Sequence, residues 1–234
     1  MSVTTESVQQ LLSSDSFSDR VRGLNQLKQI EPKLAFEMVK PLIKDPNPRI
    51  RYSAVSQLDP IGNENPPEAL ALLRDRLFND SEIDVQSVAA DVIGGLKLTE
   101  AYEDLQKVYE TTPEWLLQMS IIATLGEMGD ARGFDLLKIA LNSENSLIRT
   151  AAISSLGDLQ IPDALPLLLP LATDEDWQVR FRLAIALGNF EKDKVEKVLT
   201  ELAQDPFEQV AKTAQDILSK MNIKLLKNLN LNLH

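Results

Sequence analysis

A short pattern that returns about every 31 residues constrains the fold of this chain more than any other feature of the sequence. Each clear copy has one apolar anchor residue, and further apolar residues stand four and eight positions after it. That spacing places all three side chains on one face of an α-helix, so each copy predicts an amphipathic helix with one buried face. The five clear anchors are Ile50, Val85, Leu117, Ile148 and Val179, and weaker copies have anchors at Val21 and Val210.

A second helix is predicted before each of these, because the intervening segments, such as residues 67–80 and 194–205, also carry apolar residues at helical spacing. Gly or Pro punctuates the joints, and no window alternates with the period of two that marks a strand. The sequence therefore predicts an all-α fold, an α-solenoid of about seven helix pairs that winds as a superhelix with a concave groove. We expect one domain over residues 1–234, in which residues 221–234 extend the last helix or fray.

The composition excludes several classes of function. With 24 Lys and Arg against 35 Asp and Glu, the net charge is −11, which argues against binding to nucleic acid or an anionic membrane. The chain has no Cys and a single His, His234, so neither a metal site nor a His- or Cys-dependent catalytic site is expected. No signal peptide is recognisable and no stretch approaches the roughly 20 apolar residues of a membrane span, so we expect no membrane insertion and a cytoplasmic protein.

The face of each anchored helix that is opposite the core should line the groove, and it carries several aromatic residues. The residues two positions before and after an anchor lie on this face. Although only 5% of the residues are aromatic, both tryptophans fall there. A flat ligand or a partner helix would suit such a face, and packing between repeats is the alternative explanation. The predicted groove residues of this kind are Tyr52, Trp115, Met119, Trp177 and Phe181.

Arginines follow the anchors directly in three copies, as Arg51, Arg149 and Arg180. An Arg in this position commonly pairs with an acidic residue of the adjoining turn or repeat, which would fix the stacking of the helices. The acidic residues expected as partners are Asp45, Asp174 and Asp176.

The repeated order of acidic residue, apolar-Arg pair, small residues and Leu-Gly resembles the short HEAT repeats that occur in phycobilin lyases. Three segments, residues 49–58, 114–130 and 174–187, are more specifically similar to relatives of the E/F-type phycobilin lyases that act in phycobilisome degradation. The resemblance implies that the partners are phycobiliproteins such as phycocyanin and allophycocyanin. It also implies phycocyanobilin, a bilin, as substrate or ligand, with no permanently bound cofactor. Because lyases of this type usually act as two-chain complexes, a catalytic chain of this length would be self-sufficient or a homodimer.

Under this resemblance, two classes of function remain open. In the first, the groove binds the bilin and promotes its detachment, the aromatic residues stack on the chromophore, and Arg49, Arg180 and Arg182 hold its propionates. A carboxylate would act as the acid or base of this elimination. The candidates are Asp84, Asp91, Glu114, Glu127 and Asp176, and stabilisation of helix starts is the alternative role for Asp84, Glu114 and Asp176. In the second class, the protein is a non-catalytic adaptor that grips an antenna subunit and recruits it for proteolysis.

Overall fold

The computed structural model describes the backbone of residues 3–231 and the side chains of residues 3–223, and this part of the chain consists of helices and short connections without strands. The α-helices are α1 (Thr5–Leu12), α2 (Phe17–Gln26), α3 (Pro32–Val39), α4 (Pro48–Ser56), α5 (Leu58–Ile61), α6 (Pro66–Asn79), α7 (Ile83–Gly95), α8 (Tyr102–Thr111), α9 (Trp115–Met128), α10 (Phe134–Ala140), α11 (Ser146–Leu159), α12 (Leu165–Leu168), α13 (Trp177–Leu187), α14 (Lys192–Leu202) and α15 (Glu208–Leu231). Short 3₁₀ segments, among them η2 (Lys40–Lys44) and η7 (Leu169–Thr173), extend several of them.

The helices alternate along the chain as seven pairs within the described residues, which confirms the predicted all-α repeat architecture. The pairs are α1 with α2, α3 and η2 with α4, α6 with α7, α8 with α9, α10 with α11, α12 and η7 with α13, and α14 with α15. No helix in the described range has the length and hydrophobicity needed to cross a bilayer. The last helix continues to Leu231, so the predicted tail extends α15 up to that residue, and residues 232–234 lie outside the described part.

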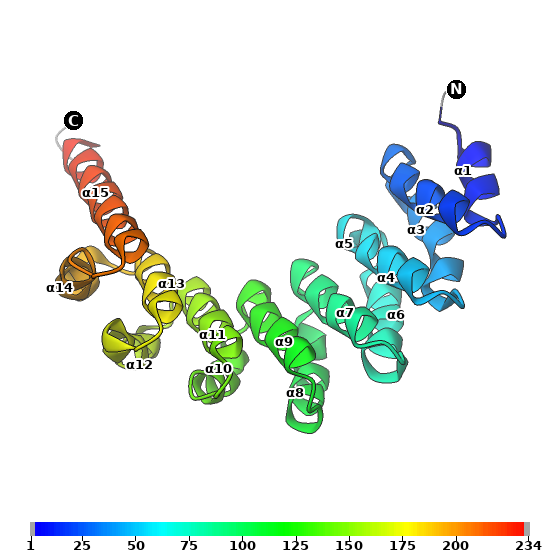
Figure 1. Ribbon diagram of the computed structural model, residues 1–234. Coiled ribbons are helices and arrows are strands. Elements are labelled where there is room, and N and C mark those ends of the chain that lie inside the picture. Colours follow the sequence, from blue (N-terminus) through cyan, green and yellow to red (C-terminus); the bar gives the residue numbers. More distant parts are fainter. Residues whose placement is uncertain (1–2, 232–234) are drawn as a thin grey trace. The chain divides into compact units, whose positions relative to one another are not determined.

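Two compact units divide the chain, residues 1–124 and residues 125–234, and the division falls within α9. In the first unit α4 packs against α2 and α7, and α6 packs against α7. In the second unit α11, α13 and α15 lie side by side, while α10 covers α11 and α14 covers α13 and α15 (Figure 1). The second helices of successive repeats thus stack on one another within each unit. The expected single domain and concave groove remain predictions.

The repeat anchors form the core. All five clear anchors, together with the apolar residues four and eight positions after them, are at most 2% exposed, and Val210 is fully buried. The anchor assigned to Val21 is wrong, because Val21 is only half-buried. Helix α2 begins at Phe17, as α4 begins at Pro48, so the third helical residue of this copy is Asp19 and not an apolar residue. The sequence pattern therefore placed the anchor of this copy two residues too far along the chain, at Val21 instead of Asp19.

Close contacts between small residues hold the second helices of neighbouring repeats together. In three copies a glycine nine positions after the anchor lies against the backbone of a residue seven positions after the next anchor. A Cβ atom on Gly126 would stand 2.5 Å from the Cα atom of Ser155, far inside van der Waals contact. Backbones can approach this closely only where the side chains between them are small. The three contacts are Gly94 with Thr124, Gly126 with Ser155, and Gly157 with Ala186.

Candidate functional site

An aromatic cluster lies at the start of α13 in the second unit. The ring of Trp177 stacks on that of Phe207, with 4.4 Å between ring centroids and 3° between ring planes. Phe181, one turn further along α13, is 6.4 Å from Trp177 at an interplanar angle of 59°. Trp177 and Phe181 are half-buried, and Phe207 is 44% exposed. We call Trp177, Phe181 and Phe207 the aromatic cluster, which offers flat apolar surface to solvent.

Phe207 was not among the predicted groove residues. It stands three positions before the anchor Val210, whereas Trp177 stands two positions before Val179. The prediction considered only residues two positions from an anchor and therefore did not include Phe207. The structure places both at the start of the second helix in consecutive repeats, since Trp177 is the first residue of α13 and Phe207 directly precedes α15. An aromatic residue in the loop before the helix was the signal available in the sequence.

The other predicted groove residues lie in the first unit. Tyr52 on α4 and Trp115 at the start of α9 are 44% and 46% exposed, and Met119 is half-buried one turn after Trp115. These three residues, like Trp177 and Phe181, therefore stay out of the buried core. The predicted face is not open along its whole length, because Ser87, at the equivalent position of α7, is only 5% exposed. A binding role for these positions remains a prediction.

The arginines that follow the anchors join one repeat to the next. Arg180 donates from Nε and Nη2 to the carboxylate of Asp205, at 2.6 and 3.0 Å, and from Nη1 to the carbonyl oxygens of Asp174 (2.6 Å) and Glu175 (3.2 Å). Every nitrogen of this guanidinium is therefore engaged within the protein. The expected pairing role is confirmed for Arg180, and its availability to a ligand carboxylate is correspondingly reduced.

Arg51 makes the same arrangement in the first unit. Its Nε and Nη2 atoms donate to Asp80 at 2.8 and 2.7 Å, and its Nη1 atom donates to the carbonyl oxygen of Asp45 at 3.1 Å. The expected side-chain partners were wrong, because the carboxylates come from Asp80 and Asp205 at the same loop position of the following repeat. Asp45 pairs instead with Arg20, at 3.0 Å. In α7 the side-chain amide of Gln86 donates to the carbonyl oxygen of Asp80, so a glutamine fills the same position there.

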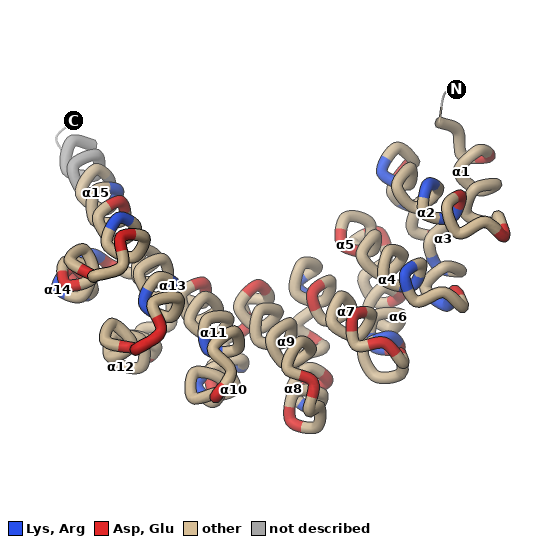
Figure 2. The backbone as a smooth tube through the Cα atoms, in the orientation of Figure 1, with Lys and Arg blue, Asp and Glu red and all other residues tan. Residues whose placement is uncertain are grey.

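The pKa values of the two carboxyl groups in these pairs, Asp205 and Asp80, are lowered. Hydrogen bonds from Arg180 hold the pKa of Asp205 below its usual value, against the opposing effect of burial. Burial acts to raise the pKa of Asp80, but hydrogen bonds from Arg51 and from the Glu82 N–H outweigh it and the net shift is downward. Both groups are thus stabilised as anions and belong to the stacking of the repeats rather than to a reactive centre. Figure 2 shows acidic residues gathered in the loop between α12 and α13, where Asp174 and Glu175 present carbonyl oxygens to Arg180.

None of the five carboxylates proposed as acid or base is buried. Asp84, Asp91, Glu114 and Glu127 are exposed. Asp176 is half-buried and caps α13 by accepting a hydrogen bond from the Gln178 N–H at 2.8 Å, the alternative role predicted for it. The described residues contain no group of His, Asp or Glu side chains arranged to hold a metal ion.

The environment of Asp158 on α11 raises the pKa of its carboxyl group. Desolvation by neighbouring atoms is the cause, and a hydrogen bond from Asn189 Nδ2, at 3.4 Å, opposes it. The same Asn189 nitrogen donates to the carbonyl oxygen of Gly157 at 3.2 Å. Asp158 was not among the candidates predicted from the sequence, because the spacing of residues within one helix does not show how far a side chain is desolvated.

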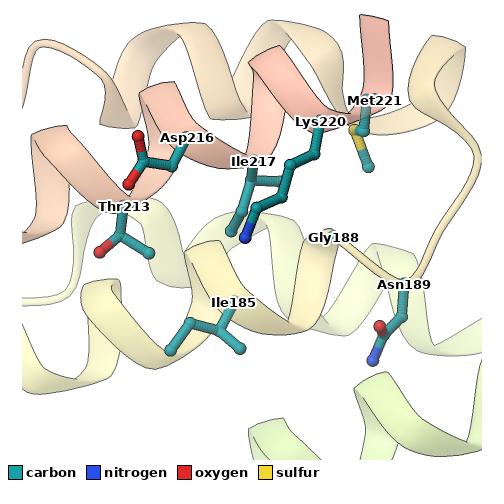
Figure 3. A pocket seen from close by; sticks show the side chains of 8 residues that line it. All are labelled: Ile185, Gly188, Asn189, Thr213, Asp216, Ile217, Lys220 and Met221. Atoms are coloured by element: carbon teal, nitrogen blue, oxygen red, sulfur yellow. The ribbon is translucent and has the colours of Figure 1, made fainter. Parts of the chain in front are cut away.

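Asn189 also lines a pocket of about 380 Å³ between α13 and α15 (Figure 3). Ile185 lies on the wall of this pocket, one helical turn beyond Phe181 and two beyond Trp177, so the pocket continues the face of α13 that carries the aromatic cluster. The lining residues are Ile185, Gly188, Asn189, Thr213, Asp216, Ile217, Lys220 and Met221.

A family profile for HEAT repeats matches residues 70–157 and 134–219, which together cover more than half of the chain. The chain belongs to the HEAT-repeat family. The matched repeats include α13 and most of its contact with α15, so the aromatic cluster and the pocket are built on HEAT repeats. No curated protein matches the chain in sequence.

Solved structures share the HEAT-repeat fold. YibA from E. coli is 15% identical, with a TM-score of 0.63, over 98% of this chain and 87% of YibA. The complex of CpcE and CpcF of phycocyanin lyase from Nostoc sp. PCC7120 is 19% identical, with a TM-score of 0.61, over 94% of this chain and 96% of the matched chain. An engineered protein is 18% identical, with a TM-score of 0.59, over 92% of this chain and 67% of its own. At these identities the similarity extends to the fold alone.

Proposed function

We propose that this chain is a phycobilisome degradation factor of the NblB type, which binds phycobiliproteins and promotes the detachment of their covalently bound bilin. The resemblance of residues 49–58, 114–130 and 174–187 to that group supports the proposal. A fold shared with the CpcE/CpcF phycocyanin lyase is compatible with it. Phycocyanin and allophycocyanin are the expected partners, and the bilin is the substrate or ligand.

The aromatic cluster is the observation on which the proposal rests. In a protein with only 5% aromatic residues, Trp177, Phe181 and Phe207 come together outside the core, and two of the rings are already parallel. Aromatic surface of this kind stacks on a flat conjugated ligand or packs against an apolar helix. A bilin attached to an antenna helix offers both features.

Detachment is an elimination that balances without an oxidant or reductant. A base removes a proton from the bilin carbon next to the one that carries sulfur, the C–S bond breaks, and the electron pair of the C–H bond becomes a new C=C bond of the bilin. The departing cysteine thiolate takes a proton from an acid. Asp176 precedes Trp177 in the chain and is the carboxylate nearest the aromatic cluster in sequence among the five candidates.

A second function, a non-catalytic adaptor, is favoured by the engagement of that carboxylate. Asp176 accepts the hydrogen bond that caps α13, and a group that stabilises a helix start is poorly placed to exchange protons with a ligand. In this form the aromatic cluster grips a helix of the antenna subunit and recruits the subunit for proteolysis. Both functions require binding to the phycobiliprotein.

One experiment tests both forms. The purified chain is mixed with holo-phycocyanin, complex formation and the visible spectrum are followed, and the sample is then denatured to ask whether bilin remains covalently attached. Loss of covalent bilin would establish detachment, and retained bilin in a stable complex would establish the adaptor. Neither complex nor spectral change, at concentrations up to about 100 μM, would reject the proposed function, since the binding free energy would then be weaker than roughly −5.5 kcal/mol.

A further inference from the structure

The pocket between α13 and α15 arises from a departure in the repeat pattern. In the three preceding contacts, the residue seven positions after the anchor is Thr124, Ser155 or Ala186, and a glycine of the previous helix packs against its backbone. In the last repeat this residue is Ile217, whose Cγ2 atom would lie 3.3 Å from a Cβ atom on Gly188. At Gly188 the nearest atoms of the next helix therefore belong to a branched side chain, whereas they include backbone atoms in the other three contacts. The pocket of about 380 Å³ lies at this point.

The lining combines an apolar surface with charged side chains. Ile185, Ile217 and Met221 supply the apolar part, and Asp216 and Lys220 stand one turn apart on α15 (Figure 3). Among the described residues, neither Asp216 nor Lys220 has an ion-pair partner, although side chains at this spacing often pair with each other. The volume lies within the usual range for ligand pockets, about 300 to 1,000 Å³.

Asn189 presents a further polar group in a fixed orientation. Its Nδ2 atom donates to Gly157 and Asp158 on α11, so the amide nitrogen is turned away from α15. An amide whose nitrogen is held in this way keeps its oxygen available as an acceptor.

We propose that this pocket binds an apolar molecule that carries a carboxylate and N–H groups. The Lys220 ammonium group pairs with the carboxylate, and the oxygens of Asp216 and Asn189 accept the N–H groups. Ile185, Ile217 and Met221 contact the apolar body, which extends along α13 towards the aromatic cluster. The inference rests on the proposed function in one respect, that a bilin, with its propionates and pyrrole N–H groups on a flat apolar frame, belongs to this class.

The test compares a free linear tetrapyrrole that has two propionic acid groups with its dimethyl ester, which lacks the negative charges. Dissociation constants are measured from the absorbance change for the intact protein, for Lys220→Gln and for the control Lys197→Gln. Lys197 is an exposed lysine of α14 that is absent from the pocket lining. The acid should bind the intact protein about tenfold more tightly than the ester, as expected for one charge-assisted contact. Lys220→Gln should abolish this preference, and Lys197→Gln should keep it.

Equal affinity for acid and ester, a preference that survives Lys220→Gln, or no binding of either compound would each overturn the inference. The proposed function is judged separately, because this titration contains no phycobiliprotein. A chain that binds holo-phycocyanin but shows no Lys220-dependent preference loses the pocket assignment alone. If the protein shows the preference but does not bind holo-phycocyanin, the pocket assignment stands and the proposed function is rejected.

Discussion

Arg180 and Asp205 form a two-pronged ion pair between consecutive repeats, with the Nε–Oδ2 and Nη2–Oδ1 distances at 2.6 and 3.0 Å. Their side chains are 12% and 5% exposed, so the pair is largely withdrawn from water. The planar guanidinium matches the carboxylate in shape, and its remaining nitrogen binds carbonyl oxygens of its own loop. One side chain thus fixes the loop before α13 to the loop before α15.

Arg180→Ala should lower the free energy of unfolding by about 3 kcal/mol, because it leaves the carboxylate of Asp205 buried without a cation. Arg182→Ala, two residues away on the same helix, is the matched control and should cost about 1 kcal/mol or less, since no ion pair is lost. Urea denaturation followed by circular dichroism gives both values. Equal losses in the two variants would contradict a stabilising role for the pair.

The same pair predicts how stability depends on pH. The pKa of Asp205 is lowered in the folded state, so the unfolded chain binds more protons in the window below the ordinary aspartate pKa of about 3.9. Its stabilising contribution is complete above that value and is lost as the pH falls through the lower, folded pKa. Asp205→Asn should therefore be less stable than the unsubstituted protein at pH 7 and lose less stability from pH 5 to pH 2. Parallel stability curves for the two proteins would refute this explanation.

Trp177→Ala should weaken binding to holo-phycocyanin by at least about tenfold, because it removes the ring that contacts both other members of the aromatic cluster. Its cost in stability should stay below that of Phe36→Ala, about 3 to 5 kcal/mol, since Phe36 is 1% exposed and Trp177 is only half-buried. Binding is measured by titration and stability by thermal unfolding. Unchanged binding by a folded Trp177→Ala protein would remove the aromatic cluster from the proposed function.

Gly126→Ala should destabilise the second unit by about 1 to 3 kcal/mol, because the added methyl group would stand 2.5 Å from the Cα atom of Ser155 and force two helices apart. Alanine normally favours a helix over glycine, so the expected loss has the opposite sign to helix propensity. Glu127→Ala, the exposed neighbour on the same helix, provides the control and should change the free energy of unfolding by about 0.5 kcal/mol or less. A stabilised Gly126→Ala protein would show that the helices are free to separate there.

The repeat can be predicted from the amino-acid sequence alone. Its period, the helical character of each segment and the buried face follow from side-chain spacing within single helices, where residues four apart necessarily lie on one side. The anchors from Ile50 to Val179 are buried as predicted, and the same spacing kept Trp115 and Trp177 out of the core. The one misplaced anchor, Val21, belongs to a copy in which Asp19 interrupts the apolar pattern.

The contacts between residues of different helices could not be predicted in this way and are known from the structure. Asp205 lies 25 residues beyond Arg180, and the sequence offered nearer aspartates of the same chemistry. The stacking of Phe207 on Trp177, the hydrogen bond from Asn189 to Asp158, and the pocket beside Ile217 likewise depend on the distance between helix axes. That distance is set by the size of a few contact residues, such as Ser155 beside Gly126 and the larger Ile217 beside Gly188. No periodicity within a single helix encodes it.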